Sequence, residues 1–303
     1  MLNRLKIAFI TFFFVLKMGS AHAQEIDTLV YKGISIISHN KVLGKEIIQE
    51  LSGIEYTGIG NAFYIIPQSK ERGHIFLSTI QFSNAGLEIV FDSILYLNQN
   101  LLEAESIRVN PKDQQVYIAE EGNGTSYIYR INSKNALEVV YTSTTKQRHN
   151  RGYEGLCFSP DGAIMYMGLE RPNSGSITNI IAYNLATKNE KVYNYTLDVL
   201  PNDKRADNGI TELLTLNDST LLVVERAFLG PKNGNSVRVY KVLISANSNE
   251  IIKVKLLTNF SASPKIDNIE GVCWSASGKE LLFISDNNGN SYQQTLLISM
   301  KVE

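Results

Sequence analysis

The hydrophobic positions fall in short runs separated by turn residues, which is typical of β-strands joined by tight turns. In one stretch the strand-like runs are residues 106–109, 116–119, 127–131 and 137–141, with the turn Asn110-Pro111-Lys112-Asp113 between the first two. The next stretch repeats this order, with the turn Ser159-Pro160-Asp161-Gly162. Helical periodicity is weak, and residues 45–51 are the best candidate for a helix. We expect an all-β protein.

A short motif, a glutamate beside small and apolar residues, recurs about every 50 residues. The motif glutamates are Glu55, Glu105, Glu154, Glu212 and Glu270. Four strand-like runs per unit are the pattern of a β-propeller blade. We predict a β-propeller of four-stranded antiparallel blades, five by repeat count, or six if residues 28–51 form more than one closing strand. The last unit has three runs before the chain ends, so residues 28–37 would supply its fourth strand and close the ring.

Residues 1–23 have the pattern of a secretory signal peptide that is cleaved before Gln24. Two basic residues precede an apolar run over residues 7–16, and Ala21-His22-Ala23 fits the cleavage site. The run is too short for a transmembrane helix, which needs about 20 residues. We therefore expect a secreted or periplasmic protein without a transmembrane segment, in which residues 24–303 form a single propeller domain.

Composition and charge exclude several function classes. The formal net charge of −1 becomes more negative when the basic signal segment leaves, so the chain has no electrostatic footprint for nucleic acid. Two cysteines, Cys157 and Cys273, cannot build a disulfide scaffold or a thiolate zinc cluster, and their apolar flanks predict that both are buried and unpaired. Motifs for a nucleophile elbow, a P-loop or a dinucleotide site are absent from the sequence. We expect a monomer.

Acidic residues also end the second strand of several units, at Glu121, Glu170, Glu225 and Asp286. Equivalent strand ends of a propeller converge on one rim of the central channel, so these acids and the motif glutamates would form two facing rings. Converging carboxylates are unfavourable unless arginine or a hard cation such as Ca²⁺ compensates them. Arg151, Arg171 and Arg226 are adjacent in sequence to these acids. The alternative is structural: the glutamates cap backbone amides or pair with arginine between blades.

The same residues resemble a known family. The matching segments are Asn150-Arg151-Gly152-Tyr153-Glu154-Gly155-Leu156, Leu169-Glu170-Arg171-Pro172, Leu222-Val223-Val224-Glu225-Arg226, Asp267-Asn268-Ile269-Glu270-Gly271 and Ser285-Asp286-Asn287-Asn288. In this order they resemble the bacterial phytase-like family, also described as "esterase-like activity of phytase". The resemblance implies a secreted β-propeller. Calcium-dependent propeller phytases hydrolyse phosphomonoesters with a calcium cluster and basic phosphate ligands at the channel mouth. Few basic residues accompany the acids here, which disfavours phytate, a strongly anionic substrate.

We therefore expect a calcium-assisted phosphoester or carboxylic-ester hydrolase that acts on a small anionic or ester substrate at the acidic rim. The candidate catalytic residues are Glu154, Glu170, Glu270 and Asp286. The candidate substrate-binding residues are Arg151, Arg171, Arg226 and Asn287. The candidate metal ligands are Glu105, Glu154, Glu225 and Glu270. Two alternatives remain: a non-catalytic secreted propeller that binds a ligand or a cell-surface partner, and a repeat whose acids only tie blades together.

Overall fold

The computed structural model describes residues 26–303 except 69–71, 84–85, 145–146, 148–150, 201–205, 231–232 and 259–265. The signal peptide expected over residues 1–23 lies outside the described residues, and so does Asn150 of the family motif. The described residues form strands and turns without a helix, so the all-β prediction is confirmed. Nothing in this part of the chain is a helix of the length and apolar character that crosses a membrane.

The prediction of a helix over residues 45–51 is wrong. Strands β2 (Val42–Leu43) and β3 (Glu46–Ile47) form a short hairpin there instead. Gly44 in its turn has φ of 62°, and Glu50 has φ of 52°. Both values lie in the left-handed region, which a right-handed helix excludes.

Two antiparallel meanders of four strands follow the hairpin. The first is β4 (Leu51–Tyr56), β5 (Ala62–Pro67), β6 (Arg72–Ser83) and β7 (Gly86–Asn100). The second is β8 (Ala104–Val109), β9 (Val116–Glu121), β10 (Ser126–Ile131) and β11 (Leu137–Thr142). Consecutive strands are neighbours in both sheets, as turn-linked runs predict.

An eight-stranded sheet comes next and consists of two such meanders. Its first half is β12 (Tyr153–Phe158), β13 (Ile164–Leu169), β14 (Ile177–Asn184) and β15 (Glu190–Thr196). Its second half is β16 (Asp207–Asn217), β17 (Thr220–Phe228), β18 (Asn235–Ser245) and β19 (Ser248–Lys255). The halves meet through one parallel bridge between Asn194 of β15 and Glu250 of β19. Each half therefore retains the four-stranded order of the other sheets.

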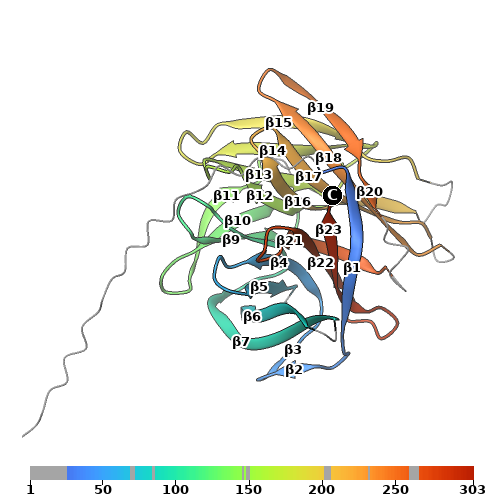
Figure 1. The fold of residues 1–303 in the computed structure, drawn as a ribbon. Coiled ribbons are helices and arrows are strands. Elements are labelled where there is room, and N and C mark those ends of the chain that lie inside the picture. Colours follow the sequence, from blue (N-terminus) through green and yellow to red (C-terminus); the bar gives the residue numbers. More distant parts are fainter. Residues whose placement is uncertain are drawn as a thin grey trace, which may run out of the picture.

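The last sheet joins both ends of the described chain. Its order is β20 (Leu257–Thr258), β1 (Thr28–Ile37), β23 (Thr295–Val302), β22 (Glu280–Asp286) and β21 (Asn268–Trp274). β1 pairs antiparallel with β23, from Leu29 opposite Val302 to Ile37 opposite Thr295. Figure 1 shows this pairing, with blue β1 beside dark red β23. The expected pairing of the run over residues 28–37 with the strands of the last unit is confirmed.

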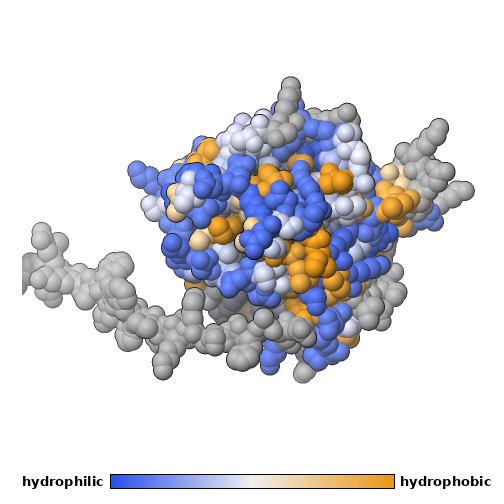
Figure 2. Space-filling view, turned by 90° about the horizontal axis from the view of Figure 1, so that it is seen from above, coloured by the Kyte–Doolittle hydropathy of each residue, from blue (hydrophilic) through white to orange (hydrophobic). Residues whose placement is uncertain are grey.

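The first strands of successive meanders contact one another in cyclic order. β4 contacts β8, β8 contacts β12, β12 contacts β16, β16 contacts β21, and β21 contacts β4. These five inner strands therefore surround a common axis, and the apolar core lies between adjacent sheets. One core cluster, for example, joins Phe63 and Phe76 of the first meander to Cys273 and Leu297 of the last sheet. Hydrophilic residues dominate the face in Figure 2, where apolar residues form separate patches.

Each inner strand carries a β-bulge near its beginning. In each case the pairing with the second strand skips one residue of the inner strand. The skipped residues are, in chain order, Ser52, Glu105, Glu154, Thr211 and Glu270. A bulge leaves the inserted residue unpaired and re-aims its side chain. These five residues are therefore structurally equivalent. The sequence alignment of Glu55 and Glu212 with the other motif glutamates is wrong, because Ser52 and Thr211 take the equivalent places.

Candidate functional site

The bulges also determine which residues are equivalent at the ends of the second strands. On each second strand, one residue pairs with the inner-strand residue that precedes the bulge. The residue that follows it on the second strand stands at the rim. The rim residues are Gln68, Glu121, Glu170, Arg226 and Asp286. Glu225, which the sequence placed in this set, is one residue out of register. The β16–β17 pair therefore contributes an arginine where the β8–β9, β12–β13 and β21–β22 pairs contribute an acid.

Arg226 bridges two carboxylates that come from different sheets. Its Nη1 lies 3.1 Å from Oε1 of Glu270, and its Nη2 lies 3.5 Å from Oε1 of Glu170. Asn268 accepts a hydrogen bond from Arg226 and donates from Nδ2 to Glu270 Oε1 over 2.6 Å. Burial alone would lower the pKa of Arg226, but the surrounding carboxylates raise it. The guanidinium is therefore a fixed positive charge among buried acids.

Glu154 is the acid with the fewest partners. Its side chain is buried, and its Oε2 has no hydrogen-bond partner among the described residues. Burial raises the pKa of Glu154 well above its ordinary value, and Glu170, Glu270 and Glu105 raise it further. Arg226 acts in the opposite direction. We call Glu105, Glu154, Glu170, Arg226 and Glu270 the channel-mouth cluster.

Three other carboxyls of this region, those of Glu105, Glu270 and Asp286, also retain protons more strongly than usual. Burial raises the pKa of Glu105, Glu270 adds to the shift, and a 2.7 Å hydrogen bond from Gln68 Nε2 opposes it. Burial raises the pKa of Glu270 to about 8 against the opposing effect of Arg226. Burial likewise raises the pKa of Asp286 to about 6, although the Asn288 amide donates to it. These shifts favour the protonated form of Glu105, Glu154 and Glu270 within the cluster.

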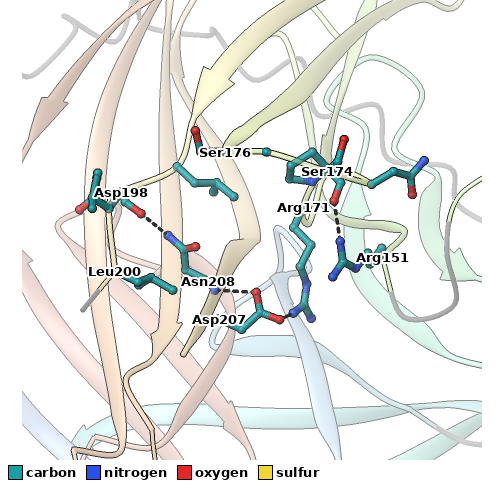
Figure 3. Close-up of a pocket in the computed structure, with 13 residues that line it drawn as sticks. Arg151, Arg171, Ser174, Ser176, Asp198, Leu200, Asp207 and Asn208 are labelled. Carbon is teal, nitrogen blue, oxygen red and sulfur yellow. Dashed lines mark hydrogen bonds and ion pairs between the residues drawn. The ribbon is translucent and has the colours of Figure 1, made fainter. Parts of the chain in front are cut away.

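Arg171 and Arg151 lie beside the cluster and line a pocket of about 600 Å³ (Figure 3). Arg171 donates from Nε and Nη2 to the carboxylate of Glu170, over 2.7 and 2.5 Å, and pairs with Asp207 at the pocket wall. Arg151 Nη1 donates to the carbonyl of Pro172 over 2.7 Å. The structure therefore brings three predicted arginines, counting Arg226, to the same region as the predicted acids.

Two predicted site residues lie elsewhere. The carboxylate of Glu225 accepts hydrogen bonds from the Asp198 amide at 2.9 Å, Asn208 Nδ2 at 2.8 Å and Lys253 Nζ at 2.7 Å. The structure does not bring it into the channel-mouth cluster. Oδ1 of Asn287 accepts from the Glu50 amide at 3.0 Å, which ties the β22–β23 loop to the start of β4. Both side chains hold neighbouring segments together.

Sequence reasoning missed Arg108, which is buried on the axis among the inner strands. It donates to the carbonyls of Ile54, Leu213 and Val272, over 3.0, 2.9 and 2.9 Å. Its Nη2 lies 2.7 Å from Glu212 Oε2, and its Nη1 lies 3.4 Å from Glu55 Oε2. The two glutamates that were misaligned with the bulge residues therefore form a separate ionic centre. The sequence signal for this ionic centre was a single arginine, Arg108, in an inner strand that is otherwise largely apolar.

The donor chemistry of the channel-mouth cluster fits a hard cation such as Ca²⁺, which prefers carboxylate oxygens. In the part of the chain that the structure describes, Glu154 Oε2 is a buried oxygen without a hydrogen-bond partner. Within the described residues, however, no three Asp, Glu, His or Cys side chains are arranged to hold a metal ion. Arg226 already bridges Glu170 and Glu270. The carboxylates of the cluster are therefore the ligand type that a hard cation prefers. In the described structure, however, Arg226 supplies the positive charge beside them.

Comparisons with solved structures give distant similarities. A protein from Lactobacillus plantarum is 11% identical, with 87% of this chain and 90% of that chain covered and a TM-score of 0.46. The periplasmic gluconolactonase of Pseudomonas aeruginosa is 11% identical, with 92% and 97% covered and a TM-score of 0.45. An engineered GH43 glycoside hydrolase is 14% identical, with 66% and 39% covered and a TM-score of 0.48. No curated protein matches the sequence.

One family model matches most of the chain, over residues 46–289. The match spans the inner strands β4 to β21, their bulges and every residue of the channel-mouth cluster. The chain therefore belongs to the Phytase-like family, described as "Esterase-like activity of phytase".

Proposed function

We propose that the chain is an exported five-bladed β-propeller that hydrolyses a phosphoric or carboxylic ester at its channel mouth. Family membership and the cyclic contacts of the inner strands support this proposal. The observation that carries it is the buried carboxyl of Glu154, which has an unpartnered oxygen beside Glu270 and Arg226. Polar groups that converge on one mouth with shifted pKa values are typical of catalytic sites.

The acids supply proton transfer in this proposal. A carboxyl whose pKa lies near the working pH can both accept and release a proton during turnover. Burial raises the pKa of Glu270 to about 8, and it raises that of Glu154 in the same direction. An ionised member of the pair takes a proton from the attacking water, and a protonated member gives one to the leaving alcohol. Glu170 and Asp286 set the local charge on which this division depends.

The arginines bind the negative charge of the substrate. Arg226 is held between Glu170 and Glu270, so its remaining donors can stabilise charge that develops on the ester oxygen. Arg151 and Arg171 line the adjacent pocket and would orient an anionic group. Glu105, Glu154 and Glu270 would have to move together to hold Ca²⁺, because no three such side chains of the described residues are arranged for a metal ion. The bound ion would neutralise an anionic ester.

The proposal includes export and a single domain. Residues 1–23 would direct secretion or periplasmic delivery and be removed. Residues 24–303 would then form the mature propeller, in which β1 closes the last blade.

The test is a substrate panel on the purified mature protein. Hydrolysis of p-nitrophenyl phosphate and p-nitrophenyl acetate is followed with calcium and with a chelator. We expect turnover of one ester, and we expect E154Q to reduce kcat about 100-fold or more, as loss of a general base does. E250Q, an exposed change on β19, is the matched control and should retain activity. Absence of turnover of either ester would reject the hydrolase and favour a binding propeller.

A further inference from the structure

Arg226 lines a second pocket, which has a volume of about 610 Å³. The end of β17, the start of β18, the start of β21 and the β22–β23 loop enclose it. Two aromatic residues, Phe228 and Tyr292, line it together with the amide side chains of Asn235, Asn268, Asn288 and Gln293. Its size lies in the range of small-molecule sites.

Both aromatic side chains that line this pocket are exposed to solvent. Tyr292 is 73% exposed and Phe228 is 37% exposed. Exposing aromatic surface forgoes the hydrophobic gain of burial. Phe228 stands at the end of β17, where it pairs with Asn235 of β18, so its position is set by the sheet. The rings therefore provide flat apolar surface on which a ligand ring can pack.

The polar wall of this pocket is held in place before any ligand binds. Asn288 Nδ2 donates to Gln293 Oε1 over 3.2 Å, and Gln293 Nε2 donates to Asp267 Oδ1 over 3.1 Å. Asp267 also accepts from the Gln294 amide at 2.9 Å. This chain of bonds fixes the loop over residues 287–294 against the start of β21. A wall that is already ordered loses little conformational entropy on binding.

The charges of the pocket select against a phosphate-rich ligand. Among its lining residues Arg226 is the cationic one, and it is already paired with Glu170 and Glu270. Asp267 adds a negative charge to the wall. Primary amides each offer donors and an acceptor, which matches hydroxyl groups, because a hydroxyl is both donor and acceptor. Aromatic surface beside amides therefore suits a ring with hydroxyls at its edge and C–H groups on its face.

We propose that this pocket binds a neutral sugar or uncharged polyol ring. Arg226 and Asn268 line the pocket and both contact Glu270 of the channel-mouth cluster, so a ring bound here would place a substituent near Glu270. This inference deepens the proposed function and rests on it for the link to catalysis: the substrate would be an ester of a neutral sugar or polyol. Binding of the free ring does not depend on turnover.

The test measures binding of free glucose, galactose, xylose, cellobiose and myo-inositol to the mature protein, by saturation-transfer NMR and calorimetry at millimolar concentrations. We expect at least one to bind. Y292A and, independently, N235A should weaken it about tenfold or more through lost stacking and lost hydrogen bonds. F82A is the matched control, because Phe82 is an exposed aromatic on β6 outside this pocket. Circular dichroism verifies that each variant is folded.

The outcomes separate the two proposals. Binding that Y292A and N235A weaken and F82A retains supports the sugar pocket even if neither nitrophenyl ester is hydrolysed. Ester hydrolysis that depends on Glu154, with no binding of any of the five compounds, overturns the sugar pocket and leaves the hydrolase. Equal binding by the wild type, Y292A and N235A also overturns it, because the ring would then bind elsewhere.

Discussion

Nη1 of Arg226 lies 3.1 Å from Oε1 of Glu270, which joins the β16–β17 meander to the β21–β22 sheet at the channel mouth. Arg226 occupies the place on β17 that Glu121, Glu170 and Asp286 occupy at the ends of β9, β13 and β22. One arginine at this place offsets part of the repulsion among acids from several sheets. Its removal would leave those buried acids without their central counter-charge.

We expect R226Q to lower the free energy of unfolding at pH 7 by about 3 kcal/mol, the loss seen when one partner of a buried ion pair is removed. The effect should be larger at pH 9 than at pH 7, because Glu270, with a pKa of about 8, loses its proton between these values. Urea denaturation at both pH values measures it. R130Q is the control, because Arg130 forms an exposed pair with Glu138 and should cost under about 1 kcal/mol. Similar losses for the two variants would contradict a central role for Arg226.

The raised pKa values predict that stability falls as pH rises. Burial raises the pKa of Glu270 from 4.5 to about 8 in the folded state, so the folded state binds more protons than the unfolded state between these values. The free energy of unfolding should therefore decrease from pH 5 to pH 8, by at most about 1.4 kcal/mol per pH unit for one group. E270Q should flatten this slope in urea titrations. A wild-type profile that rises over this interval would refute the raised pKa.

The fold was accessible from the sequence because strand-length apolar runs and turn residues recur with a period that the chain obeys to its last unit. The pairing of Thr28–Ile37 with β23 followed from counting strands. The site was only partly accessible. A bulge shifts the strand register by one residue and leaves no mark in the neighbouring sequence. Glu212 therefore seemed equivalent to Glu154, whereas the equivalent residue is Thr211. The same one-residue slip assigned the rim to Glu225 and concealed that Arg226 occupies it.

Calcium provides a test of whether the channel-mouth cluster binds a cation. A ligand that binds only the folded state stabilises it by about 2.7 kcal/mol at 100 times its Kd. If Glu105, Glu154 and Glu270 hold the ion, millimolar calcium should raise Tm of the wild type, and E154Q and E270Q should abolish the increase. The difference in Tm with and without calcium is the measurement, because either substitution alone can change stability by relieving repulsion. E250Q should retain the full increase, whereas no shift in the wild type would reject a calcium site.

Arg108 is expected to be among the most sensitive positions of the fold. R108M leaves the carboxylates of Glu55 and Glu212 uncompensated and the carbonyls of Leu213 and Val272 without their donor. We expect a loss of about 3 to 5 kcal/mol, or failure to fold. R108K retains the charge but lacks the planar fork that reaches several strands, so it should recover part of this loss. If R108M unfolds at nearly the wild-type urea concentration, the axial arginine is dispensable.

Glu225 provides the sharpest test of the bulge register, since sequence alignment made it a metal ligand and the structure gives it different partners. Its carboxylate is buried and accepts from Asn208 and Lys253, which tie β16 and β19 to β17. E225Q should therefore lower the free energy of unfolding by about 2 kcal/mol, as loss of charge-assisted hydrogen bonds does. It should leave the calcium-induced increase in Tm at its wild-type size, unlike E154Q. If folded E225Q lost the calcium-induced increase in Tm, Glu225 would have to lie at the rim. A side chain outside the channel mouth cannot ligate an ion within it.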